Sequence, residues 1–215
     1  MLNAGQRKAG YALLFCLGTE ERQSMNEKSE LKVQRMKSYF LEAAKQIITA
    51  EGAENISARR VAEIAGYSYA TIYNYFKDID ELLGETKAFM VTDVIKHMQA
   101  AIDFTINNTE DLVKMFVAYT GYYLDHPHIF RFFYCYRLSD TESAKEQYDF
   151  NLPWAAALQF LIEDGRLKEC DMETCAKTVI YSVHGLMALY FSGNGLTEEM
   201  LLADINKVIQ YIVRG

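Results

Sequence analysis

The sequence is poor in residues that break helices and in residues that build covalent or metal frameworks. It has only 2 prolines and 12 glycines among 215 residues, which excludes collagen-like and proline-rich architectures and disfavours a turn-dense β-sandwich. Its 4 cysteines form no CxxC pair and no zinc-ligand spacing, so we expect reduced thiols in a cytoplasmic protein, with no metal and no cofactor. The apolar run 11–17 is too short to span a bilayer, so we expect no membrane partner.

The N-terminal segment faintly resembles a secretory signal peptide, because Arg7 and Lys8 precede the apolar run 11–17. The residues that follow, 18–21, are a poor cleavage context. Met25 is an alternative start of the natural protein. We therefore interpret residues 1–30 as a disordered or extraneous arm rather than as a secretion signal.

The composition predicts helices and an uneven distribution of charge. Half of the residues are hydrophobic and 24% are charged, so the chain can bury a core. The net charge is −7, but residues 25–77 carry +2 and residues 78–215 carry −10. A mildly basic segment on an acidic body is compatible with a polyanionic partner, although +2 is a weak electrostatic signal for nucleic acid.

Capping signals divide the basic segment into short helices. Residues 32–51 have helical periodicity and precede Gly52; Ser57 then begins a second helix that ends at Gly66. We expect Ser68 to cap a third helix over 69–75, and Asp78 to cap a fourth over 79–104 with Glu81. Two short helices joined by a glycine turn have the helix-turn-helix layout, in which the second helix enters the DNA major groove. An ordinary helical hairpin is the alternative.

The third helix has a composition that favours DNA binding over simple packing. Five of its seven residues have polar groups: Tyr69, Thr71, Tyr73, Asn74 and Tyr75. Hydroxyl and amide groups can reach phosphates and base edges, and Lys77 follows directly. We expect this stretch to be presented outward to a duplex.

Residues 40–83 resemble the DNA-binding head of the TetR family of bacterial transcription regulators. The resemblance is carried by Phe40, by the stretches 56–62 and 65–76, and by Leu82 and Leu83. It implies an all-α homodimer with an N-terminal helix-turn-helix head, here 31–78, and a C-terminal body, here 79–215, that binds a ligand and dimerises. It also implies double-stranded operator DNA and a small-molecule effector as partners.

The resemblance assigns roles to individual residues of the head. Tyr69, Ala70 and Thr71 occupy the positions that face bases. The positions that contact the phosphate backbone are Ser57, Arg59, Ser68, Tyr73, Tyr75 and Lys77. The sequence departs from the family at Ile79, where a phosphate-contacting lysine is common, and Lys77 is a candidate substitute.

The body is rich in aromatic residues, with eight between positions 119 and 136. They indicate either a core and dimer seam or a pocket for a hydrophobic or aromatic effector. The residues that we expect to bind the effector are Tyr119, Tyr123, Phe130, Phe133, Tyr134, Trp154 and His184. For His184 a hydrogen-bonded core position is the alternative. His126 and His128 lack a third ligand, so we expect no metal there.

The last two helices, over 173–191 and from Thr197 onward, are the candidates for dimerisation, since Ser182, Gly185 and Ala188 allow close approach. No catalytic motif is present, so we do not expect an enzyme. The leading hypothesis is a repressor that a small molecule releases from a palindromic operator. An activator and a non-specific architectural DNA-binding protein are the alternatives. The sequence does not determine the effector, the operator or the sign of regulation.

Overall fold

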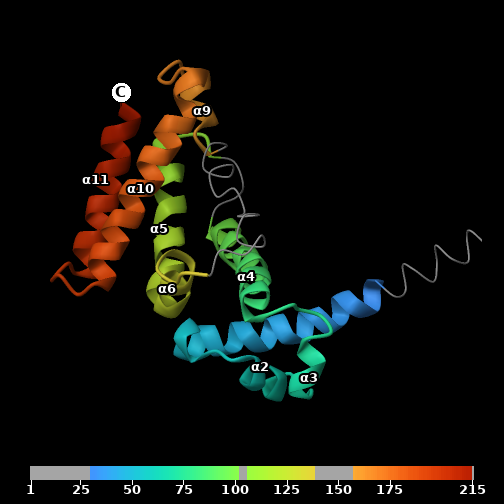
Figure 1. Cartoon of the computed structure of the whole chain (residues 1–215). Coiled ribbons are helices and arrows are strands. Elements are labelled where there is room, and N and C mark those ends of the chain that lie inside the picture. Colours follow the sequence, from blue (N-terminus) through green and yellow to red (C-terminus); the bar gives the residue numbers. More distant parts are fainter. Residues whose placement is uncertain (1–29, 102–105, 139–156, 215) are drawn as a thin grey trace, which may run out of the picture.

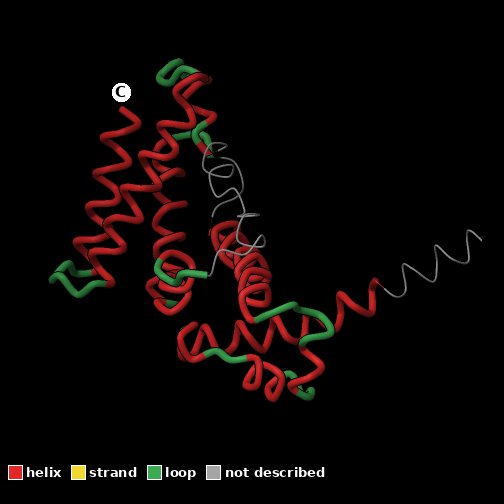
Figure 2. The backbone as a smooth tube through the Cα atoms, viewed as in Figure 1, coloured by secondary structure: helices red, strands yellow, loops and turns green. Residues whose placement is uncertain are grey.

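A computed structural model describes residues 30–101, 106–138 and 157–214 of the chain. Helices and their connecting turns make up these ranges, and none of them contains a β-strand (Figures 1 and 2). The helices predicted from the composition, and the all-α fold class that the resemblance implies, are therefore confirmed for the described residues. After a first helix over 30–51, the elements are η1 (Ala53–Asn55), α2 (Ala58–Ile64), α3 (Tyr69–Ile72), α4 (Ile79–Ala101), α5 (Thr109–Asp125), α6 (Pro127–Tyr134), α9 (Gln159–Glu163), η2 (Glu169–Asp171), α10 (Met172–Phe191) and α11 (Glu198–Arg214).

The first helix, α2 and α3 surround a small core at one end of the molecule (Figure 1). Phe40 is fully buried at its centre, and Val61 of α2 and Ile72 of α3 pack around it. The predicted cap of α2 is confirmed, because the Ser57 hydroxyl accepts a hydrogen bond from the Arg60 N–H at 3.3 Å. Gly66 ends the turn after α2 with a φ of +78°, a conformation that glycine adopts readily.

The third helix is shorter than the sequence predicts. Regular helix stops at Ile72, and the chain continues to Phe76 as hydrogen-bonded turns. Ser68 is the N-cap residue of this helix, as predicted, but its side chain makes no capping bond and instead lies 2.8 Å from the Thr71 hydroxyl. Tyrosines and the β-branched Thr71 and Ile72 have modest helix propensity, so local sequence does little to extend the helix.

Helix α4 connects the small core to the rest of the chain. Asp78 accepts a hydrogen bond from the Glu81 N–H at 2.8 Å, which confirms the predicted cap. The Glu81 carboxylate reaches the backbone N–H of Lys77 rather than that of Asp78. Two adjacent buried residues of α4 pack in different cores. Leu82 lies in the small core, and Leu83 lies in the larger core of the rest of the chain. Helix α4 is thus anchored in both.

The body is a bundle in which α5 packs against α4, α6 and α11, and α10 packs against α11 (Figure 1). Asn108 caps α5 by accepting from the Asp111 N–H at 2.9 Å. The apolar and aromatic periodicity predicts a helix from Ile129, but α6 begins two residues earlier, at Pro127, because proline fits the first position of a helix, where no N–H partner is needed. Thr197 caps α11 through the Met200 N–H at 3.2 Å, as expected.

Part of the body core comes from the N-terminal helices. Ile48, near the end of the first helix, and Ala53 are buried within the large cluster of the body. The division into an arm of 1–30, a head of 31–78 and a body of 79–215 stays a prediction. The arm up to residue 29, the loop predicted over 139–149 and the start of the helix at Pro153 lie outside the described residues. Within the described part, no helix combines the length and apolar character needed to cross a bilayer.

Candidate functional site

The surface of α3 and of the turn that follows it presents hydroxyl groups to solvent. We call Ser68, Tyr69, Ala70, Thr71 and Tyr73 the recognition surface. The Tyr69 side chain is 53% exposed and that of Tyr73 is 44% exposed, whereas Ile72 between them is buried and anchors the segment. The two tyrosine hydroxyls lie 3.0 Å apart, and their rings meet edge to face at 5.2 Å between centroids. Mutual contact therefore fixes two outward-pointing tyrosines on a very short helix.

The two other tyrosines near this surface, Tyr67 and Tyr75, contact the core of the head. Tyr75 is only partly exposed, and its ring centroid lies 5.9 Å from that of the buried Phe40. Tyr67 also contacts Phe40, at 5.5 Å. Sequence composition alone does not separate Tyr67 and Tyr75, whose rings contact Phe40, from Tyr69 and Tyr73, since all four are tyrosines within nine consecutive positions.

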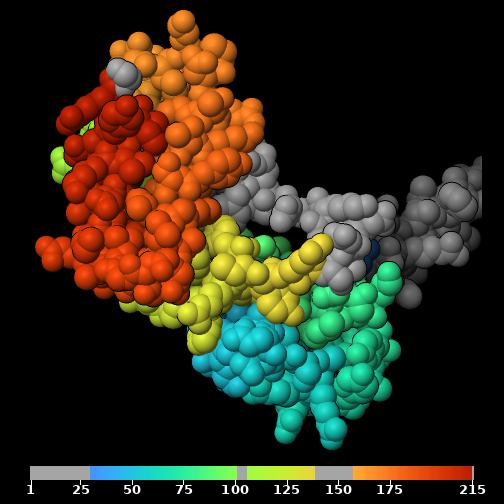
Figure 3. Space-filling model, turned by 60° about the vertical axis from the view of Figure 1, so that its left-hand side comes forward, coloured from blue at the N-terminus to red at the C-terminus, as the bar shows by residue number. Residues whose placement is uncertain are grey.

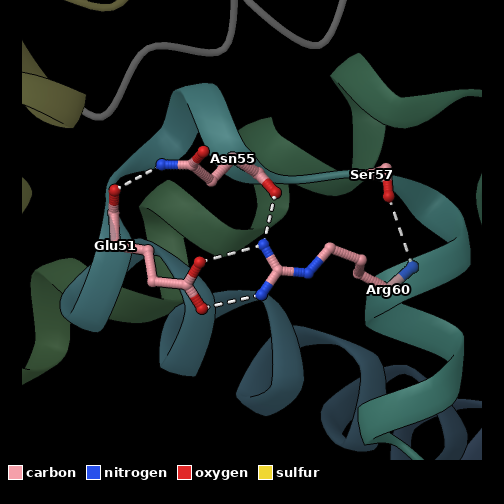
Figure 4. Close-up of polar contacts among 4 residues, drawn as sticks. All are labelled: Glu51, Asn55, Ser57 and Arg60. Atoms are coloured by element: carbon pink, nitrogen blue, oxygen red, sulfur yellow. Dashed lines mark hydrogen bonds and ion pairs between the residues drawn. The ribbon is translucent and has the colours of Figure 1, made fainter.

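A polar clamp holds α2 against the end of the first helix (Figure 4). The Arg60 guanidinium donates to both carboxylate oxygens of Glu51, at 3.0 and 2.7 Å, and to the Asn55 carbonyl oxygen at 2.9 Å. The hydrogen bonds from Arg60 lower the pKa of Glu51, and the same carboxylate raises the pKa of Arg60. Sequence reasoning missed this pair, because a separation of nine residues across a turn follows no helical period.

Arg59 and Lys77 are exposed and, unlike Arg60, have no carboxylate partner among the described residues. Within the described part of the chain, neither side chain forms an ion pair. Ile79, which stands where the family commonly has a lysine, is partly buried and packs against both cores. A charged residue at 79 would have to leave this apolar contact, whereas Lys77, two positions earlier, is exposed.

The recognition surface lies at the end of the molecule opposite α10 and α11 (Figures 1 and 3). Helix α4 connects the two regions. Its attachment to the first helix includes two ion pairs, Lys37 with Glu85 at 2.5 Å and Lys45 with Asp93 at 2.7 Å. Because these pairs are eight residues apart on both helices, displacement of α4 would carry the first helix with it.

In the body, α5, α6 and α10 bring together six of the seven residues that the sequence singles out for effector binding. We call Tyr119, Tyr123, Phe130, Phe133, Tyr134 and His184 the tyrosine–histidine cluster. The Tyr119 hydroxyl lies 2.7 Å from the Tyr134 hydroxyl and 2.6 Å from His184 Nε2. The Tyr123 and Tyr134 hydroxyls are 3.4 Å apart. Trp154, the seventh residue, lies outside the described residues.

The cluster is an apolar environment with a polar centre. The Phe130 ring lies 5.0 Å from that of Tyr134 and 5.6 Å from that of Tyr123, and the Phe133 ring lies 6.3 Å from Tyr123. Burial raises the pKa of Tyr134 to about 12 and lowers the pKa of His184 to about 4. At neutral pH these groups are uncharged and can serve as hydrogen-bonding groups.

The other described histidines and cysteines lie in separate surroundings. The His126 ring lies tilted against that of Tyr122, at 4.8 Å between centroids, and the His128 Nδ1 atom is buried without a hydrogen-bond partner. Among the residues that the structure describes, no three His, Cys, Asp or Glu side chains form a group that could hold a metal ion. Cys135, Cys170 and Cys175 are free thiols.

Comparison with known proteins identifies the head. Residues 40–86 match the family described as bacterial regulatory proteins, tetR family. No curated protein matches the chain.

The fold of the whole chain is similar to solved structures. A TetR transcriptional regulator from Rhodococcus is 20% identical, with a TM-score of 0.56 over 85% of this chain and 97% of the other. A TetR-family regulator from Haemophilus influenzae is 19% identical, with a TM-score of 0.58 over 82% and 96%. Thermus thermophilus FadR, a TetR-family repressor solved with lauroyl-CoA, is 16% identical, with a TM-score of 0.59 over 83% and 91%.

The head match covers the helices that carry the recognition surface, and the body has the helical architecture of these regulators. Residues 40–86 therefore form a helix-turn-helix head of the tetR family of bacterial regulatory proteins, and the chain has the fold of solved TetR-family transcriptional regulators.

Proposed function

We propose that the protein is a homodimeric repressor that binds a palindromic operator and is released by a hydrophobic or aromatic small molecule. The outward-pointing pair Tyr69 and Tyr73 on α3 is the observation that carries the proposal. In a helix-turn-helix protein the second short helix lies in the major groove, and two heads of a dimer bind half-sites about one helical turn apart.

The predicted DNA-contacting residues of the head divide into base-reading and backbone-contacting groups in this proposal. Tyr69, Ala70 and Thr71 face base edges, since their hydroxyl and methyl groups can donate, accept or contact thymine. Backbone contacts come from Ser57, Arg59, Ser68, Tyr73, Tyr75 and Lys77. Arg59 and Lys77 are exposed, whereas Arg60 is paired with Glu51. This difference supports Arg59 and Lys77 as the cations that contact phosphate.

Dimerisation through α10 and α11 is supported by apolar side chains that the protomer leaves exposed. Tyr181 is 63% exposed, Leu189 51%, Met200 50% and Tyr211 84%. Gly185 lies among them within α10, and a Cβ atom added there would meet nothing within 4 Å in the protomer. Glycine inside a helix costs about 0.5–1 kcal/mol relative to alanine, so the close approach of another chain gives it a physical reason.

The tyrosine–histidine cluster is the proposed effector site, because it combines large apolar rings with uncharged hydrogen-bonding groups. It is built from α5, α6 and α10, and α5 packs directly on α4. An effector that favours one position of α4 would shift the population of head orientations by its differential affinity for the two states. The ion pairs Lys37–Glu85 and Lys45–Asp93 support transmission from α4 to the head.

Operator binding by hydroxyl-deletion variants tests the proposal. Duplexes bound by the protein are selected from a randomised pool, and affinity is measured by fluorescence anisotropy. We expect the combined Thr71→Val and Tyr73→Phe variant to lose about tenfold or more, since one good base or backbone contact contributes about 1–3 kcal/mol. Tyr39→Phe, a similar change at an exposed tyrosine of the first helix, is the control. Unchanged binding by the double variant would contradict the assignment of α3.

A further inference from the structure

Three partly buried lysines lie along α4, and one of them differs from the others. Lys37 and Lys45 of the first helix each reach a carboxylate of α4, Glu85 and Asp93. Lys87 of α4 instead donates to the backbone oxygen of Phe133 at 2.7 Å, and its Nζ lies 5.8 Å from the centroid of the Phe133 ring. No carboxylate of the described residues lies within ion-pair distance of Lys87.

An ammonium group in this position is incompletely compensated. It has three N–H donors, and the structure gives it one carbonyl acceptor and one aromatic face. Removing a cation from water without a counter-ion is unfavourable, and burial lowers the pKa of Lys87 accordingly. Lys37 and Lys45, in contrast, each have a carboxylate partner on α4.

The location of Lys87 connects it to the tyrosine–histidine cluster. Phe133, which Lys87 contacts through both backbone and ring, lies 6.3 Å from Tyr123 and 6.2 Å from Tyr134 between ring centroids. Tyr134 in turn contacts His184 at 4.2 Å. A molecule with an apolar part among these rings would therefore have Lys87 as the cation next to the cluster.

We propose that the effector is an amphipathic carboxylate whose anionic group pairs with Lys87 while its hydrocarbon part lies in the tyrosine–histidine cluster. This inference rests on the proposed function, in which the cluster is the effector site. The carboxylate supplies the missing counter-ion and accepts from donors that the Phe133 carbonyl leaves unused. Because Lys87 belongs to α4, the effector would contact the connecting helix directly.

A purely structural role for Lys87 makes a different prediction. Phe133 lies in the last turn of α6, where carbonyl groups lack helical partners and attract cations. If Lys87 serves only to hold α6 against α4, its removal destabilises the protein and weakens charged and uncharged ligands equally. If it is a ligand-binding group, its removal abolishes discrimination between them.

The experiment compares acids with their isosteric amides on the purified full-length chain. The probes are biphenyl-4-carboxylate with biphenyl-4-carboxamide, and decanoate with decanamide. Dissociation constants come from calorimetry, and the shift of the melting temperature is a second readout. The variants are Lys87→Met, which keeps the length of the side chain, and Lys87→Arg, which keeps the charge. Lys96→Met, at an exposed lysine of the same helix, is the matched control.

We expect at least one acid to bind the wild-type protein tenfold or more tightly than its amide. Lys87→Met should remove this preference, whereas Lys87→Arg and Lys96→Met should retain it. Three results would overturn the inference: equal affinity of acid and amide for the wild type, an undiminished preference in Lys87→Met, or no stabilisation of the wild type by either acid. The second of these results includes an equal loss of affinity for the acid and the amide in Lys87→Met, which would favour the structural role.

Ligand binding is measured without DNA, and release of the selected operator is measured separately. The two results therefore distinguish failure of this inference from failure of the proposed function. If acids bind through Lys87 but leave the selected operator occupied, regulation by release fails and the ligand assignment stands. If an uncharged compound releases the operator and no acid binds, the proposed function stands and the ligand assignment fails.

Discussion

Two adjacent arginines of α2 should respond differently to the same substitution. Arg59 is exposed and forms no ion pair within the described chain, whereas Arg60 is bound to both carboxylate oxygens of Glu51 (Figure 4). If Arg59 neutralises one phosphate per head, a dimer loses two phosphate contacts in Arg59→Gln. Each contact contributes a slope of about −0.9 to the plot of log affinity against log salt concentration. The slope should therefore become about 1.8 less steep.

The assay is fluorescence anisotropy with the selected operator between 50 and 200 mM KCl. Both proteins lose affinity as the salt concentration rises fourfold. With a slope difference of about 1.8, the loss for the wild type should be roughly tenfold greater than the loss for Arg59→Gln. Arg60→Gln is the matched control, with the same loss of charge at the neighbouring position. Its slope should stay that of the wild type, while its free energy of unfolding falls because Glu51 loses two hydrogen bonds.

Equal changes of slope in the two variants would refute this reasoning, because general electrostatics rather than position would then govern binding. A slope unchanged in Arg59→Gln would remove Arg59 from the phosphate-contacting set. Urea unfolding of both variants, followed by circular dichroism, confirms that any difference in slope is measured on folded protein.

Three further predictions concern the body. Tyr119→Phe keeps the ring but removes the hydroxyl that contacts Tyr134 and His184, so urea unfolding should show a loss of about 1–3 kcal/mol. The folded-state pKa of His184 is about 4, below its ordinary value, so stability should be constant above pH 6.5 and fall by up to about 3 kcal/mol as the pH drops toward 4. Measured by urea unfolding across pH, His184→Gln should flatten that dependence. Leu189→Glu places a charge among the exposed apolar residues of α10, so sedimentation should show monomers in place of dimers; a persistent dimer would exclude this face.

The sequence alone determined the fold class and the head, because their signals are local. Ser57 and Asp78 cap helices through backbone groups three residues away, and Gly66 ends a turn through its own φ angle. Such interactions involve few residues and depend little on the rest of the chain. The caps that Asn108 and Thr197 provide for α5 and α11 are local in the same way. It failed for the length of α3, where weak propensity left the outcome to packing against Phe40.

Only the tertiary structure decided which of several chemically identical residues are exposed and which pack against or pair with other side chains. Composition does not separate Tyr69 from Tyr75, or Arg59 from Arg60, since the difference lies in what each side chain meets after folding. Lys87 and Phe133 are 46 residues apart, and Tyr119 and His184 are 65 apart. Contacts of this kind depend on how helices pack, and packing is set by the fit of many side chains at once rather than by any local pattern.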